Sequence, residues 1–124
     1  MPLYKIDFYR DEDGRSELLD FINKLLLSSE TSKDARIQYD KIYSQIEMLR
    51  EKGTSLPAKY TKHIEDNIWE LRPGKNRILY FCWIDDTFVL LHYFRKTTEK
   101  TPRREIEKAK RERDDYLRRC KDEI

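Results

Sequence analysis

The chain has 124 residues, with 26 Lys and Arg against 24 Asp and Glu, a formal net charge of +2, 38% hydrophobic residues and 12% aromatic residues. This length suits one domain over residues 1–124, and the aromatic content argues against disorder. The longest apolar run, Ile78–Ile84, is too short to span a bilayer, and the N-terminus lacks the apolar core of a signal peptide. We therefore expect a cytoplasmic protein with no membrane contact.

The first half of the chain predicts a strand followed by two helices. Leu3–Tyr9 alternates between apolar and polar side chains, as a strand with one wet face does. Ser16 can cap a helix whose Leu, Phe and Ile residues keep helical spacing. A second helix is expected from Ser32 or Asp34 to Lys52, with Gly53 placed to end it.

The second half predicts three consecutive strands and a helix. The strands are Ile68–Arg72, Arg77–Ile84 and Phe88–Arg95, joined by Pro73-Gly74 and Asp85-Asp86 turns. The segment Thr54–Asn67 reads as a loop, with a short strand near Tyr60–His63 as an option. Thr101 as the cap and Pro102 at the first helical position would begin the last helix. This order predicts an α+β domain: a mostly antiparallel sheet, two N-terminal helices packed on one face, and a C-terminal helix.

Positive charge is concentrated between Ile68 and Arg104. Eight basic residues (Arg72, Lys75, Arg77, Arg95, Lys96, Lys100, Arg103, Arg104) stand there against four acidic ones (Glu70, Asp85, Asp86, Glu99). The rest of the chain is net negative, so the predicted sheet and its exits form a surface on which a polyanion could lie. The two cysteines, Cys82 and Cys120, lack metal or redox spacing, and we expect neither a metal nor a cofactor.

Four sequence motifs follow one another in this region. They are WELR (Trp69–Arg72), RILYF (Arg77–Phe81), VLLHYFRKTTEKTP (Val89–Pro102) and REIEKAKRERDDY (Arg104–Tyr116). Together they resemble the phage-type, HigB-like branch of the RelE toxin superfamily. The resemblance implies a small RelE-like domain that acts as the toxin of a type II toxin–antitoxin pair, a ribosome-dependent mRNA interferase that cuts translated mRNA in the A site. It also implies mRNA, the ribosome and a HigA-like helix-turn-helix antitoxin as partners, with operator DNA bound through the antitoxin.

Metal-free RNA cleavage requires a site that neutralises the phosphorane formed when the 2′-OH attacks the phosphate. Arginine suits this because its planar fork holds two phosphate oxygens and keeps its charge. Arg72 ends one predicted strand and Arg77 begins the next, so the turn should bring both to one phosphate. Lys96 matches the first lysine of the family's F-x-K-K-T-x-K-T-P motif. The second lysine is Thr97 here, and Arg95 precedes Lys96, so the positive charge is kept but displaced.

The proton carrier stays open between Tyr93 and His92. Histidine titrates near neutrality, but His92 alternates with core residues and can equally be structural. Among the other candidates for RNA contact, Tyr80 can stack a base, and Lys75, Arg95 and Lys100 add positive charge near the strand ends.

Two other functions fit the same sequence. The first is a non-catalytic module that binds RNA or the ribosome through the basic surface and needs no proton carrier. The second is a degenerate toxin that serves as an operon corepressor together with a helix-turn-helix antitoxin. Loss of growth without cut RNA would favour the first, and insensitivity to loss of Arg77 would favour the second.

Overall fold

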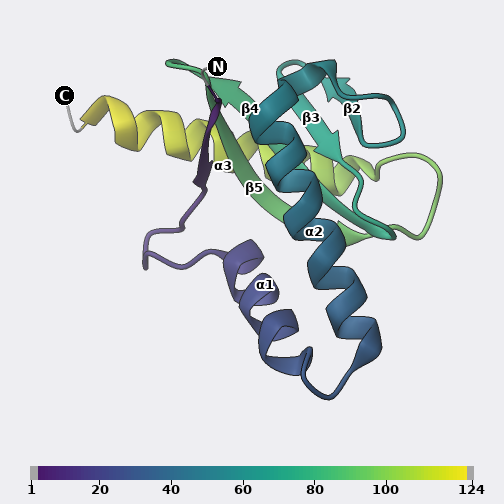
Figure 1. The fold of residues 1–124 in the computed structure, drawn as a ribbon. Helices are drawn as coiled ribbons and strands as arrows, with labels where there is room; N and C mark the ends of the chain where they lie inside the picture. Colours follow the sequence, from purple (N-terminus) through teal and green to yellow (C-terminus); the bar gives the residue numbers. More distant parts are fainter. Residues whose placement is uncertain (1–2, 123–124) are drawn as a thin grey trace.

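A computed structural model describes residues 3–122. In chain order the elements are β1 (Lys5–Phe8), α1 (Glu17–Ser28), α2 (Lys33–Lys52), a 3₁₀ turn (Gly53–Ser55), β2 (Thr61–Glu65), β3 (Ile68–Leu71), β4 (Asn76–Trp83), β5 (Thr87–Arg95) and α3 (Arg103–Asp122) (Figure 1). The three consecutive strands and all three helices were predicted. The optional short strand before them exists as β2.

The five strands form one sheet in the order β1-β5-β4-β3-β2. β1 pairs with β5 in parallel, with Lys5 opposite Thr87, and every other pairing is antiparallel. The predicted α+β class with a mostly antiparallel sheet is therefore confirmed.

Helices cover both faces of the sheet (Figure 1). On one face α1 and α2 bury a core that includes Leu18, Ile42, Leu49, Ile78 and Leu90. On the other face α3 packs through Ala109 against strand residues such as Leu79, Phe81 and Val89. Because β4 is covered on both sides, its sequence is apolar on both sides, which is why alternation could not tell one face from the other.

A β-bulge changes the alternation in β5. Leu79 of β4 pairs with His92, but the next residue, Tyr80, pairs with Leu90, so Leu91 is an extra residue in its strand. As a result Leu91 packs in the core under α3, and His92 also contacts α3 through hydrogen bonds. The predicted alternation of His92 with Phe88 and Leu90 is therefore wrong, since those two residues pack in the core under α1 and α2.

The predicted cap is confirmed at Ser16 but not at Thr101, and Ser32 caps α2 in the same way as Ser16 caps α1. The hydroxyls of Ser16 and Ser32 accept hydrogen bonds from the N–H groups of Leu19 and Ala35, each at 3.1 Å. Thr101 is not a cap, because α3 begins at Arg103 and the Thr101 hydroxyl donates to Glu70 instead.

Gly53 ends α2 as predicted, with φ +62°, a conformation that favours glycine. A Cβ at this position would lie 2.9 Å from two ring carbons of Tyr4, so a larger residue would also collide with the chain before β1.

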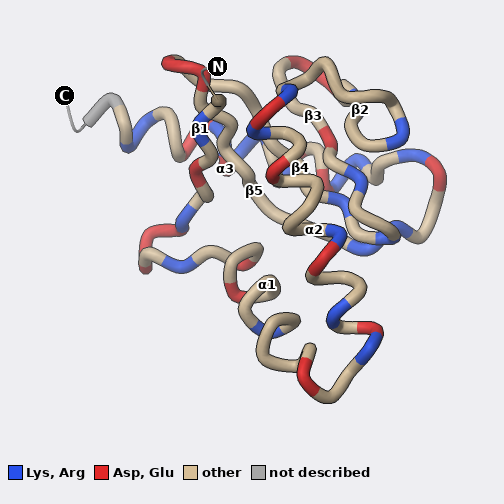
Figure 2. Tube along the Cα trace, in the orientation of Figure 1, with Lys and Arg blue, Asp and Glu red and all other residues tan. Residues whose placement is uncertain are grey.

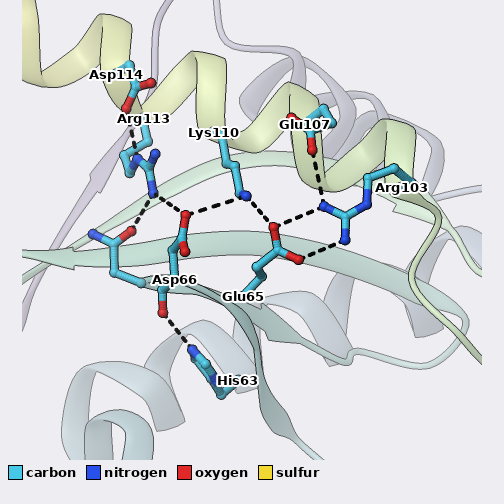
Figure 3. A network of polar contacts seen from close by, with 9 residues as sticks. His63, Glu65, Asp66, Arg103, Glu107, Lys110, Arg113 and Asp114 are labelled. Atoms are coloured by element: carbon cyan, nitrogen blue, oxygen red, sulfur yellow. Dashed lines mark hydrogen bonds and ion pairs between the residues drawn. The ribbon is translucent and has the colours of Figure 1, made fainter.

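An ion-pair network ties α3 to the turn between β2 and β3 (Figure 3). Glu65 accepts two hydrogen bonds from Arg103, at 2.7 and 2.9 Å, and one from Lys110. One turn further along α3, Arg113 donates to the Asn67 side chain at 2.7 Å. We call Glu65, Asp66, Arg103, Lys110 and Arg113 the α3 clasp.

Candidate functional site

The carboxylate of Glu70 is the centre of a polar cluster at the end of β3. Glu70 is only 2% exposed. Its Oε2 accepts a hydrogen bond from Arg72 Nε at 3.0 Å and lies 4.0 Å from Arg77 Nε. Its Oε1 accepts from the Thr101 hydroxyl at 2.8 Å. The carboxylate therefore joins the end of β3, the start of β4 and the loop that leads into α3.

Strand alternation explains why these side chains meet. Leu71 and Ile78 pack in the core under α1 and α2, so their neighbours Glu70, Arg72 and Arg77 point to the α3 face of the sheet. The buried negative charge of Glu70 compensates for part of the positive charge of the two guanidinium groups, as a buried ion requires.

Arg77 supports the turn between β3 and β4. Its Nη1 donates to the carbonyls of Gly74 and Asn76, both at 2.8 Å, and its side chain is 11% exposed. Burial lowers the pKa of its guanidinium, although the nearby Glu70 acts in the opposite direction. Much of the hydrogen-bonding capacity of Arg77 is thus used within the protein.

Arg72 is the more accessible of the two arginines. Its side chain is 26% exposed, and its Nη1 makes only a long hydrogen bond, 3.3 Å, to the carbonyl of Ala58. Arg72, Lys62, Thr101 and Lys100 line a pocket of about 300 Å³ beside the Glu70 cluster. We call this pocket the Arg72 cleft, and it has the cations to hold a phosphate.

Lys96 lies at the same end of the sheet, next to the β3–β4 turn. Its Nζ is 3.4 Å from Glu99, and the Glu99 carboxylate also acts electrostatically on Arg77. The backbone N–H of Lys96 donates to the carbonyl of Lys75 at 2.8 Å, which extends the pairing of β5 with β4. The structure therefore brings Arg72, Arg77 and Lys96 together, with Lys100 in the Arg72 cleft.

Tyr93 and Tyr80 lie on the opposite face of the sheet. The ring of Tyr93 stacks on Phe21 of α1 with centroids 4.0 Å apart, and burial raises the pKa of its hydroxyl. Tyr80 is fully buried, its hydroxyl is 2.6 Å from that of Thr61, and burial raises its pKa to about 12. Tyr80 therefore offers no ring face to a base, and Tyr93 is separated from the Arg72 cleft by the sheet.

His92 is fully buried and is held by α3. Its Nδ1 lies 2.5 Å from Glu112 Oε1 and its Nε2 3.0 Å from Glu105 Oε1. Both ring nitrogens are used and no part of the ring is open to RNA, so the structural alternative for His92 fits this geometry and the role of proton carrier does not.

Lys75 and Arg95 face the α2 side of the sheet. Arg95 pairs with Asn76, whose side chain donates to Gln38 of α2 at 3.0 Å. Both basic residues line a pocket of about 220 Å³ against α2. Basic residues thus gather at the end of the molecule where the β3–β4 turn and the loop before α3 lie, but they serve two faces of the sheet (Figure 2).

The sequence indicated Glu70 only as one of four acidic residues in the basic region, and its contact with Thr101 was not predicted. The only signal for Thr101 was its place in the KTTEKTP motif, where it reads equally well as a helix cap. Within residues 3–122, no group of three or more His, Cys, Asp or Glu side chains could hold a metal ion, and no helix is apolar and long enough to cross a membrane.

The fold and the site describe a small α+β domain with basic side chains held around a buried carboxylate at one end of the sheet. The structure is similar to a chain in the crystal structure of the archaeal RelE-RelB complex from Pyrococcus horikoshii OT3, with a TM-score of 0.54 and 14% sequence identity over 78% of this chain and 98% of that chain. The fold is therefore RelE-like. The family described as "Phage derived protein Gp49-like (DUF891)" matches residues 30–114, so the chain belongs to the Gp49-like family. The comparison with curated proteins gives no match.

Proposed function

We propose that this protein is the toxin of a type II toxin–antitoxin pair, of the HigB-like kind, and that it cleaves translated mRNA in the ribosomal A site without a metal ion. The observation that carries the proposal is the convergence of Arg72, Arg77 and Lys96 around Glu70 and Glu99 beside an open cleft. Membership of the Gp49-like family and the RelE-like fold support it.

In this mechanism the scissile phosphate lies in the Arg72 cleft. The ribose 2′-oxygen bonds to phosphorus and loses its proton to solvent, and the bond from phosphorus to the 5′-oxygen breaks, leaving a 2′,3′-cyclic phosphate and a 5′-hydroxyl. Arg72 neutralises the charge on the phosphoryl oxygens, because its guanidinium is partly exposed and is oriented by Glu70. Fixing the donor in advance is what makes such stabilisation effective.

Arg77 and Lys96 have different parts in this proposal. Arg77 adds positive potential and keeps the β3–β4 turn in place through its two carbonyl contacts. Lys96 is half-buried and pairs with the exposed Glu99, which lines the Arg72 cleft. We assign to Lys96 the transfer of a proton to the departing 5′-oxygen. This assigns the proton transfer to a lysine rather than to Tyr93 or His92.

The test is induction of the protein in cells, followed by mapping of new 5′ ends across mRNAs with and without a translation inhibitor. Wild-type protein should produce new ends only during translation. Arg72→Ala should abolish them while the protein remains folded by circular dichroism, and Arg111→Ala on α3 is the control, because Arg111 is exposed and lies away from the cleft.

The results also separate the other two functions. Arrested growth without new 5′ ends would indicate a module that binds RNA or the ribosome without cutting. Full toxicity of Arg72→Ala would exclude the assigned site, and no toxicity of the wild-type protein would favour a corepressor.

A helix-turn-helix antitoxin of the HigA-like kind is the proposed partner. It could act by covering the Arg72 cleft with acidic residues or by making the particle too large for the A site. Titrating the antitoxin into a translation extract checks this, since cleavage that continues undiminished in the complex would contradict both.

A further inference from the structure

We propose that a groove beside α2 is a second RNA-binding surface, in which Lys41 and Lys59 hold phosphates of the strand that flanks the cleaved position. This inference rests on the proposed function in taking RNA as the substrate, and it adds residues that neither the motifs nor the site around Glu70 include. The groove consists of two adjoining pockets, of about 600 and 220 Å³, that share Lys41 and Gly74 as lining residues. We call them together the α2 groove.

The α2 groove is rich in basic side chains. Its walls carry five basic residues (Lys41, Lys59, Arg72, Lys75, Arg95) and two acidic ones (Asp34, Asp40). Crowding of one sign of charge in a hollow raises the local potential and attracts a polyanion.

Most of these cations have no ionic partner. Within residues 3–122, no ion pair includes Lys41, Lys59, Lys75 or Arg95, whereas Arg72 pairs with Glu70. The Lys59 ammonium lies 4.9 Å from the centre of the Tyr60 ring, which attracts the cation but carries no net negative charge. Unpaired cations repel one another, and binding a chain of phosphates relieves that repulsion.

Arg72 connects the α2 groove to the cleft of the proposed reaction. It lines both the larger pocket of the groove and the Arg72 cleft. Its Nη1 donates to the carbonyl of Ala58, the residue next to Lys59. A strand whose phosphate lies on Arg72 can therefore continue into the pocket that Lys59 and Lys41 of α2 line.

The floor of the groove holds a polar atom that no protein donor satisfies. Gln45 is 8% exposed, and its Nε2 donates to the Arg72 carbonyl at 3.1 Å. Its Oε1 has no hydrogen-bond partner among the described residues, although buried acceptors are normally paired. A ribose hydroxyl or a base amine is a donor of the kind this oxygen lacks.

The experiment measures binding of a short fluorescein-labelled single-stranded RNA to the full chain by fluorescence anisotropy over a series of KCl concentrations. Lys41→Glu/Lys59→Glu should weaken binding by about tenfold or more. The slope of log K against log salt should also decrease in magnitude by about 1.4, the value for two lost phosphate contacts to a single strand. The control, Lys5→Glu/Lys24→Glu, makes the same change of charge at exposed residues of β1 and α1 and should bind within about twofold of wild type.

A double variant that keeps both positive charges distinguishes a loss of RNA contacts from a folding defect. Lys41→Arg/Lys59→Arg should bind RNA as wild type does, which a mere defect of the glutamate protein would not explain. Wild-type RNA affinity of the glutamate variant would overturn the inference. So would equal weakening by the control variant, because the effect would then come from net charge alone.

The same variants in a translation extract separate this inference from the proposed function. If the wild-type protein cuts no mRNA but the glutamate variant still binds RNA more weakly than its control, the proposed function fails and the groove stands. If the glutamate variant keeps its RNA affinity and loses only its antitoxin, the groove belongs to an acidic protein partner and the inference is overturned.

Discussion

The basic residues of α3 and those of the α2 groove are the same residue types in different electrostatic settings. Among the described side chains of α3, every Lys and Arg except Arg111 belongs to an ion pair. In the α2 groove only Arg72 does. Ion pairs of Arg103, Lys108, Lys110 and Arg113 fix α3 against other elements, while the cations of the α2 groove without an ion pair to any described residue remain available for a ligand.

The largest loss of stability should come from substitution of Glu70, whose ion pairs with Arg72 and Arg77 lie within the proposed site. Glu70→Leu leaves two partly buried guanidinium groups without their carboxylate, and breaking a buried ion pair from one side costs about 3–5 kcal/mol. Urea denaturation should show this loss of unfolding free energy. Glu70→Leu protein as stable as wild type would mean that the cluster contributes nothing to the fold.

The second effect concerns His92, the buried contact between β5 and α3. His92→Leu removes the partner of Glu112 and one of the two partners of Glu105, which keeps its ion pair with Arg104. Leaving the largely buried Glu112 carboxylate unsatisfied should cost about 1–3 kcal/mol. The urea midpoint measures the change, with Arg111→Ala as a control that should leave it unaltered. If cleavage per folded molecule also disappeared, the structural reading of His92 would be incomplete.

The third effect is confined to acid pH and involves the α3 clasp. Hydrogen bonds from Arg103 and then Lys110 lower the pKa of Glu65 from 4.5 to about 2. Because the folded-state pKa is lower than the unfolded one, the stabilisation is present above about pH 4.5 and is lost as the pH falls toward 2. Glu65→Gln should therefore lower stability at neutral pH and flatten its dependence on pH between these values, as acid titration followed by circular dichroism would show.

The smallest change in protein stability should come from substitutions in the α2 groove. Lys41→Ala and Arg95→Ala remove side chains that have no ion pair with any described side chain, so each should change the free energy of unfolding by no more than about 0.5 kcal/mol. Thermal and urea unfolding both check this. A large loss of stability would mean that Lys41 and Arg95 stabilise the fold as the paired residues of α3 do. The two groups of basic residues would then not differ.

The sequence was sufficient to predict how Arg72 and Arg77 approach each other. One residue ends a strand, the other begins the next, and a short Pro-Gly turn leaves few ways to connect them. Local rules also gave the cap at Ser16 and a start of α2 at Ser32 or Asp34, because capping depends on residues within one helical turn.

The failures involve contacts between distant segments. The faces of Tyr80 and Tyr93 could not be read from β4 and β5, since helices cover both sides of the sheet. The side of the sheet on which His92 lies depends on a β-bulge, and no residue in the sequence indicates that bulge. Thr101 has a cap-like sequence but a tertiary partner, Glu70, which lies 31 positions earlier in the chain.

The parallel pairing of β1 with β5 has a consequence for synthesis on the ribosome. Lys5 pairs with Thr87, so β1, which is synthesised before the other strands of this sheet, stays unpaired until β5 follows it. Arg95 and Lys96 come at and just beyond the end of β5, and Thr101 lies beyond them. A nascent chain therefore cannot complete this sheet before β5 has been synthesised, or assemble the cluster around Glu70 before Thr101 has followed it.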